Sequence, residues 1–268
     1  MKIKFYITTY NNNEILNDWI LKSLHESDYD RDNVEIFVID NHSNVHINDE
    51  YKFVKVLANN LRPDFSTGHL SRNHNQAIIN GFESLIDPKC DVVVSCQNDT
   101  KVLKNWYQIL CEAMKTYTFF TTGTGDQFQA WKTEGVRNIG LYDERFCNIG
   151  LQEADYFLRA YLYNKEKTSL NDKIHGRFHN RFNLPIIENT ETGFQRKESS
   201  HLESQKLHNI SCAVLYKKWG AEYSDKKGIF WHRIDNLDEM KCLTENYVMY
   251  PYFEKDIIDP VGKRYTGI

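Results

Sequence analysis

The chain has 268 residues, of which 41% are hydrophobic and 26% charged, with a formal net charge of −4 and a sequence pI near 6.2. This composition is typical of a globular protein with a substantial core, and the acidic balance argues against a general nucleic-acid binder, which is normally basic. No apolar run is long enough for a transmembrane segment, and the polar N-terminus predicts a first strand rather than a signal peptide.

The first half of the chain alternates strand and helix patterns. Strands are predicted at 3–9, 34–39, 53–57 and 91–96. Apolar residues at helical spacing mark three helices, two between these strands and one after the last: Leu16, Trp19, Ile20 and Leu24 after Asn11–Asn13; Ile78, Phe82 and Leu85; and Trp106, Ile109, Leu110 and Ala113. This alternation with short connections predicts a mostly parallel sheet with helices on both faces.

The pattern changes after about Thr116. Segments 117–122 and 128–139 are predicted to be β-rich, and a helix is expected at about 152–163. Residues 188–206 are polar and rich in Glu, Ser and Lys, a composition typical of a mobile loop. The stretch from Ile210 to Trp219 and the aromatic-rich tail beyond it predict a small C-terminal extension.

The cysteines and histidines show little pattern. No paired spacing links the six cysteines, Cys90, Cys96, Cys111, Cys147, Cys212 and Cys242, several of which lie inside predicted strands or helices. This usage favours a reduced, intracellular setting, and we expect a cytoplasmic protein. No Ser-His-Asp or Cys-His arrangement stands out, and His74 has no evident partner.

The segment Val92–Thr100 carries the most functional information. Its β-branched run is typical of a strand buried on both faces, and it ends in the polar residues Gln97, Asn98 and Asp99. Ligands of open α/β sheets bind outside the carboxyl ends of the strands, where a carboxylate suits a divalent cation that carries phosphates. Alternatively, Asn98–Thr100 only caps the next helix.

Further motifs lie on either side of this segment. Thr9-Tyr10-Asn11 and Asp40-Asn41-His42-Ser43 end the first two strands, and Gly68 with Ser71-Arg72-Asn73 precedes it. After it come Ile139–Phe146, then Gln152-Glu153-Ala154-Asp155 and Arg159. Together these resemble the family-2 glycosyltransferases over residues 3–180. The resemblance implies the α/β GT-A fold, which is Rossmann-like with a mostly parallel central sheet and helices on both faces, plus a small C-terminal extension.

The resemblance also implies a domain division and an activity. Residues 1–187 would form the catalytic domain, with a nucleotide-binding half at 1–100 and an acceptor and catalytic half at 101–187. Residues 188–268 would form the mobile loop and extension, in which Lys218-Trp219-Gly220 is similar to an ending found in rhamnosyltransferase-like members. The implied activity is inverting transfer of a hexosyl or deoxyhexosyl group from a nucleotide sugar to a hydroxyl of a glycan or glycoconjugate.

Catalytic and donor-binding roles follow from the same resemblance. Glu153 would be the general base, with Asp155 in the same catalytic motif, and Asp40 would bind the nucleobase. The donor-binding residues would be Thr9, Tyr10, Asn11, Asp40, Asn41, Ser43, Arg72, Asn98, Asp99 and Arg177. Read without the family, Asp155 and Arg159 are a plain i, i+4 surface pair, and Glu153 is an ordinary first-turn acid.

A metal site is expected from Asp99 and His175, which would hold Mn²⁺ or Mg²⁺. His175 and Arg177 belong to an alternating series with Lys173, His179 and Arg181; an extended segment would place all of them on one side, where they would grip a diphosphate. Alternatively the series is a solvated basic loop. A zinc pair of His175 and His179 on a helix lacks a third ligand in sequence reach.

The motifs depart from the family pattern at two places. The family's D-x-D is Gln97-Asn98-Asp99 here, which leaves one certain carboxylate ligand, and the base is Glu in place of Asp.

Two other functions stay open. One is a sugar-1-phosphate nucleotidyltransferase, although the expected Gly-rich loop is absent from Thr9–Asn13. The other is a non-catalytic relative that binds a carbohydrate or nucleotide.

Overall fold

The computed structural model describes residues 1–41, 43–59, 70–123, 126–146, 151–164, 185–188 and 201–219. Within these residues six strands form one sheet in the order β3-β2-β1-β4-β6-β5. Their bounds are β1 Ile3–Thr9, β2 Val34–Asp40, β3 Val54–Ala58, β4 Val92–Gln97, β5 Phe119–Thr122 and β6 Phe128–Trp131. The first four pair in parallel, whereas β6 runs antiparallel to both β4 and β5. The predicted mostly parallel sheet is confirmed.

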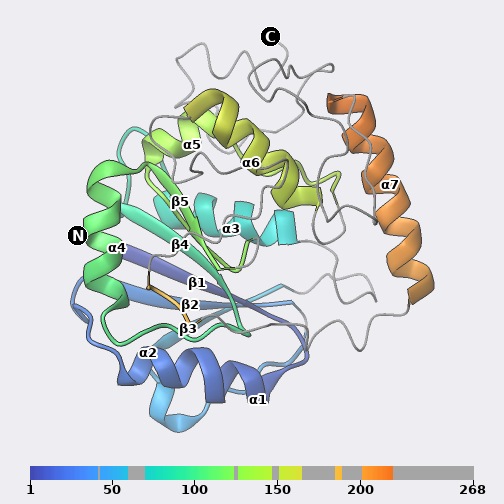
Figure 1. Cartoon of the computed structure of the whole chain (residues 1–268). Helices are drawn as coiled ribbons and strands as arrows, with labels where there is room; N and C mark the ends of the chain where they lie inside the picture. The colour runs from blue at the N-terminus through green and yellow to red at the C-terminus, as the bar shows by residue number, and fades with distance from the viewer. Residues whose placement is uncertain are drawn as a thin grey trace.

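Helices cover both faces of this sheet (Figure 1). On one face α1 (Asn13–Ile15) continues through the π-helical η1 (Leu16–Leu21) into α2 (Lys22–Glu26), and α4 (Trp106–Thr116) lies beside the sheet. On the other face lie α3 (Leu70–Phe82), α5 (Thr133–Ile139) and α6 (Leu151–Asn164). The remaining helices are the 3₁₀ turn η2 (Asp49–Tyr51) and α7 (His201–Trp219).

The alternation of side chains along the strands divides the described core into two layers. Phe5 and Ile7 belong to the layer with the α1–α2 segment and α4, whereas Tyr6 between them belongs to the layer with α3, α5 and α6. Gly81 lets α3 approach the sheet closely, because a Cβ at this position would overlap the Val93 side chain of β4.

One predicted strand segment is wrong in part. The β-rich reading of 128–139 holds only to Trp131, where β6 ends, because Thr133–Ile139 forms α5. Val136 and Ile139, one turn apart, are both buried in the core, and Gly140 ends the helix with a φ of 91°. A helix of this length is too short to show helical periodicity clearly, which explains the error.

The C-terminal segment also differs from expectation. Helix α7 begins at His201, so the last residues of the loop expected at 188–206 are helical. Leu215 and Trp219 of α7 belong to the same core layer as Tyr156 of α6. The end of α7 is therefore packed against the helix that carries Glu153.

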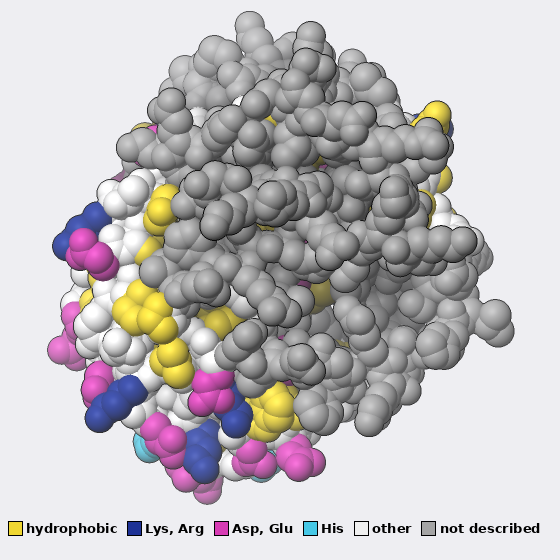
Figure 2. All heavy atoms as spheres, viewed as in Figure 1, with side chains coloured by type: hydrophobic (Ala, Val, Ile, Leu, Met, Phe, Trp, Pro, Cys, Tyr) yellow, Lys and Arg dark blue, Asp and Glu magenta, His cyan; other side chains and the backbone are white. Residues whose placement is uncertain are grey.

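The described surface is of mixed charge. In Figure 2 basic and acidic side chains lie side by side over the described part of this face. Among the residues that the structure describes, none of the helices combines the length and apolar character needed to cross a membrane. Cys90, Cys96, Cys111 and Cys212 are not joined in disulfides.

Candidate functional site

The predicted donor-binding motifs meet at the carboxyl edge of the parallel strands. Thr9 at the end of β1 is in register with Asp40 at the end of β2, and Thr8 is in register with Gln97 at the end of β4. The chain passes from β1 outward to β2 and β3 and then returns to the other side of β1 at β4. This edge is therefore a topological switch point, where α/β folds bind ligands.

Hydrogen bonds join these strand ends. The Asn98 side chain donates to the Thr9 hydroxyl at 2.9 Å, and the Asn98 backbone N–H donates to the Thr8 carbonyl at 3.2 Å. The Asn41 N–H donates to the Thr9 carbonyl at 3.2 Å, while its side-chain oxygen accepts from Asn59 at 3.0 Å. These hydrogen bonds fix Thr9, Asn41 and Asn98 relative to one another at the carboxyl edge of the sheet.

The carboxylate of Asp40 holds the turn that follows β2. Its oxygens accept hydrogen bonds from the backbone N–H of Ser43 at 2.9 Å, from the Ser43 hydroxyl, and from the backbone N–H of Val45 at 3.2 Å. Asp40 is buried. In this structure the carboxylate of Asp40 is therefore hydrogen-bonded to residues of its own turn.

Three other residues predicted to bind the nucleotide-sugar donor are more exposed to solvent than Asp40. Tyr10 is half-buried, and Asn11 is exposed with a φ of 47°, a left-handed conformation that Asn tolerates well. Arg72 lies half-buried in the first turn of α3. Arg177 and His175, with the rest of the basic series and Gly68, lie outside the described residues.

Asp99 is a buried acid just beyond β4, with 6% of its surface exposed. Burial raises the pKa of its carboxyl to about 6, and the negative charge of Asp126 adds to the increase, while a backbone hydrogen bond opposes it. A carboxylate buried in this position is costly to ionise, so a bound cation would be stabilising. The helix-cap alternative is not supported, because α4 begins only at Trp106.

The predicted base Glu153 reaches the same edge from α6. It lies buried in the first turn of that helix, and its Oε2 accepts a hydrogen bond from the backbone N–H of Asp126 at 3.1 Å. The Asp126 carboxylate in turn accepts from the side-chain amide of Gln97 at 2.5 Å. A short hydrogen-bonded path therefore joins α6 to the end of β4.

Asp126 and His74 were not predicted from the sequence. His74 Nε2 lies 2.8 Å from Asp126 Oδ2, and His74 Nδ1 lies 2.9 Å from the Ser95 hydroxyl. This is a Ser-His-Asp chain, contrary to expectation, but Ser95 lies fully buried within β4 and is no accessible nucleophile. The signal for Asp126 was its place just before a strand that pairs with β4, a pairing that the sequence pattern did not reveal.

Asp155 lies in a buried network of charges. Its carboxylate accepts hydrogen bonds from Arg159 Nε at 3.0 Å and from Trp219 Nε1 at 2.8 Å, and it forms an ion pair with Lys218 Nζ at 2.7 Å. The side chains of Asp155 and Arg159 are both 0% exposed, so the surface-pair alternative is wrong. Two hydrogen-bond donors and two further cationic nitrogens, Arg159 Nη2 at 3.0 Å and Lys218 Nζ, surround this carboxylate, so it anchors α6 and α7 to each other.

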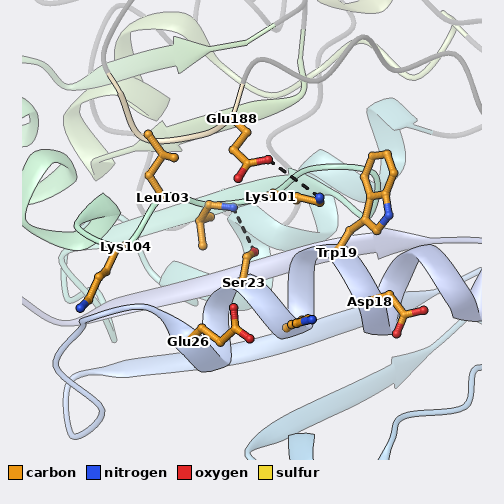
Figure 3. A pocket seen from close by; sticks show the side chains of 10 residues that line it. Asp18, Trp19, Ser23, Glu26, Lys101, Leu103, Lys104 and Glu188 are labelled. Carbon is orange, nitrogen blue, oxygen red and sulfur yellow. Dashed lines mark hydrogen bonds and ion pairs between the residues drawn. The ribbon is translucent and has the colours of Figure 1, made fainter.

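A hollow of about 430 Å³ lies between the α1–α2 segment and the loop that follows β4 (Figure 3). The α1–α2 segment contributes Trp19, and the loop after Asp99 contributes Lys101, whose Nζ lies 4.9 Å from the centre of the Trp19 ring. Opposite charges are mixed along its walls, and Lys101 Nζ pairs with Glu188 at 3.9 Å. None of the predicted site residues lines this hollow.

The metal site stays a prediction. Among the described residues no three His, Cys, Asp or Glu side chains gather as a metal site. Asp99 is a buried carboxylate that a cation would stabilise, and Mg²⁺ in particular is often bound by one or two carboxylates together with substrate phosphates. The residues present therefore fit a cation that arrives with a phosphorylated donor.

No family model matches the chain, and neither does any curated protein. Among solved structures it is similar to S. aureus TarS 1–349 in complex with UDP-GlcNAc, with a TM-score of 0.50 and 12% identity over 81% of this chain and 67% of that one. It is also similar to TarS 1–349 (TM-score 0.49, 16% identity, 80% and 71% of the two chains). A third similarity is to the mannosyltransferase PcManGT from Pyrobaculum calidifontis in complex with GDP-Man and Mn²⁺ (TM-score 0.43, 16% identity, 62% and 53%). The similarity to the TarS complex, over four fifths of this chain, confirms the expected GT-A fold.

Proposed function

We propose that this protein is an inverting glycosyltransferase that uses a nucleotide-sugar donor, with Glu153 as the general base. The supporting observation is the path from Glu153 through Asp126 to Gln97, two residues before Asp99. It brings the predicted base and the predicted donor edge into one connected site, although they lie more than fifty residues apart in the sequence.

In the proposed reaction the Glu153 carboxylate takes the proton from a hydroxyl of the acceptor. The acceptor oxygen forms a bond to the anomeric carbon as the bond from that carbon to the diphosphate oxygen breaks, through an oxocarbenium-like transition state. The electron pair of the broken bond leaves with the nucleoside diphosphate, and the proton stays on Glu153 until it is lost to water. Configuration at the anomeric carbon is inverted.

The donor would lie along the carboxyl edge. Asp40 would exchange its hydrogen bond from the Ser43 hydroxyl for one from the nucleobase, and Arg72 would pair with the diphosphate. Asp99 would hold Mn²⁺ or Mg²⁺, which neutralises charge on the leaving diphosphate when bound. Roles for His175 and Arg177 remain predictions from the resemblance.

The test is a panel of nucleotide sugars incubated with the protein and Mn²⁺, with release of nucleoside diphosphate as the readout. Slow hydrolysis of one donor, accelerated by a glycan acceptor, is the expected result. Pyrophosphate release from a nucleoside triphosphate and a sugar 1-phosphate would instead identify a nucleotidyltransferase. Donor binding by calorimetry without any turnover would identify a non-catalytic relative.

A further inference from the structure

Two side-chain amides converge on the carboxylate of Asp126. The Nε2 of Gln97, at the end of β4, lies 2.5 Å from Asp126 Oδ1, and the Nε2 of Gln152, next to Glu153, lies 3.4 Å from Oδ2. Gln97 stands at the first position of the D-x-D, and Gln152 at the first position of the acidic motif that holds Glu153; the resemblance implies an acid at both. These two amides therefore meet at one buried residue.

The surroundings of Asp126 explain why both positions are amides. Its carboxylate is 2% exposed, and it also accepts a hydrogen bond from His74 Nε2 at 2.8 Å. Burial alone would raise the pKa of Asp126, but the hydrogen bond and charge of His74 hold it below its usual range, so this residue carries the negative charge. An acid at position 97 or 152 would add a further carboxylate at hydrogen-bond distance, beside that of Glu153, which is unfavourable in a buried site.

The partners of Asp126 come from three different elements. His74 belongs to α3, Gln97 to β4 and Gln152 to α6. The His74 ring is itself packed 4.7 Å from the ring of Tyr142 and bonded to Ser95. With its side chain fixed from three directions, the backbone of Asp126 is fixed too, and its N–H points at the Glu153 carboxylate.

We propose that Asp126 is a positioning residue of the transferase site, which carries the buried negative charge in place of acids at positions 97 and 152 and orients Glu153 through its backbone N–H. This inference rests on the proposed function. It makes Gln97 a donor that serves Asp126, and not a degraded metal ligand.

A charge exchange between Gln97 and Asp126 tests this inference. Gln97→Glu should lower kcat at least tenfold through repulsion between two carboxylates. Asp126→Asn should lower kcat to a similar extent, because the negative charge is lost and one of the two accepting oxygens becomes an NH₂ donor. The double variant Q97E/D126N restores one acid and one amide in contact, and its kcat should recover to within about threefold of wild type. Donor KM and the Kd from calorimetry should change less than threefold, because the described partners of the Asp126 carboxylate are protein side chains.

The matched control is Gln129→Glu. Gln129 is as buried as Gln152, but its amide lies 3.4 Å from the backbone carbonyl of Asp126 and not from the carboxylate. The pair Q129E/D126N should show no recovery. Losses of kcat that follow the loss of folded protein, or a Q97E/D126N variant no more active than Asp126→Asn, would overturn the inference.

A comparison that leaves Asp126 unchanged covers the case in which Asp126→Asn does not fold. Gln97→Met and Gln97→Glu both remove the donor, but only the second adds a charge. The loss of kcat should be at least fivefold larger for Gln97→Glu, and equal losses would overturn the inference. The proposed function itself fails by a different result, namely a wild-type protein that turns over no donor in the panel.

Discussion

Lys218 Nζ of α7 lies 2.7 Å from Asp155 Oδ1 of α6 and 3.0 Å from Asp143 Oδ2 in the loop between α5 and α6. All three side chains are buried. Lys218 thus bridges Asp143 and Asp155, the two ends of the segment 143–155, which includes the start of α6. Since Glu153 is one of the residues in that segment, the C-terminal helix helps to hold the proposed base in place.

Replacing Lys218 by methionine should destabilise the protein strongly. The substitution removes the cation shared by Asp143 and Asp155, and breaking a buried ion pair costs on the order of 3–5 kcal/mol. Asp143 keeps Arg145 and Asp155 keeps Arg159 as partners, so the loss should not exceed this range. Urea unfolding at pH 7 measures the effect. Lys217→Met, at the exposed neighbouring position, is the control and should change stability by less than about 0.5 kcal/mol. A Lys218→Met protein within about 1 kcal/mol of wild type would show that the network contributes little.

Asp143 should make the protein sensitive to acid. Burial alone would raise the pKa of this carboxyl, but hydrogen bonds and charges from Arg145 and Lys218 hold it well below its usual range. A lowered folded-state pKa stabilises the fold above the unfolded value near 4, and the stabilisation is lost as the pH falls from there toward the folded pKa. The free energy of unfolding of Asp143→Asn should therefore lie below that of wild type at pH 7, with a gap that narrows below pH 4. A gap that does not change with pH would contradict this assignment.

Asp99 should show the opposite pH dependence. Its pKa is raised to about 6, so ionisation disfavours the folded state, and stability should decrease as the pH rises from about 4 to 6. The cost at pH 8 is on the order of 3 kcal/mol. Asp99→Asn should therefore be more stable than wild type at pH 8 and similar to it at pH 4, as measured by thermal unfolding. Metal-dependent donor turnover should be lost.

The control for Asp99→Asn is Asp87→Asn, because the Asp87 side chain is 91% exposed. That variant should unfold at the same temperature as wild type at both pH values. If Asp99→Asn is no more stable than wild type at pH 8, then Asp99 is not the desolvated carboxylate that the structure indicates.

Glu153→Gln tests the proposed base directly. The amide keeps the size of the side chain and an oxygen that can accept from the Asp126 N–H, but it cannot take a proton. We expect kcat to fall by about 10²–10⁴-fold, the usual contribution of a general base, with donor binding retained. Initial rates measure kcat, and calorimetry measures donor binding.

The control for Glu153→Gln is Glu134→Gln, which makes the same change at an exposed position in the first turn of α5 and should be fully active. If Glu153→Gln retains transfer, Glu153 is not the general base.

The amino-acid sequence was sufficient to predict the first three strands, β4 and the helices between them. Apolar runs and helical stripes are local properties, and each parallel strand ends where its apolar run meets polar residues. For this reason Thr9, Asp40 and Asp99 were placed at one edge in advance. The seven-residue helix α5 was not predicted, because a helix so short shows only two turns of periodicity in its sequence.

What the sequence by itself determined is therefore the parallel half of the sheet and the polar edge at which it ends. What only the tertiary structure decided is which buried side chains meet there. Asp126, His74 and Gln152 come from segments far apart in the chain, and Lys218 comes from a helix that local composition did not connect to the site. Their contacts arise because β6 pairs with β4 and α7 packs against α6, and the pairing of distant segments depends on the packing of the whole core, which no local pattern encodes.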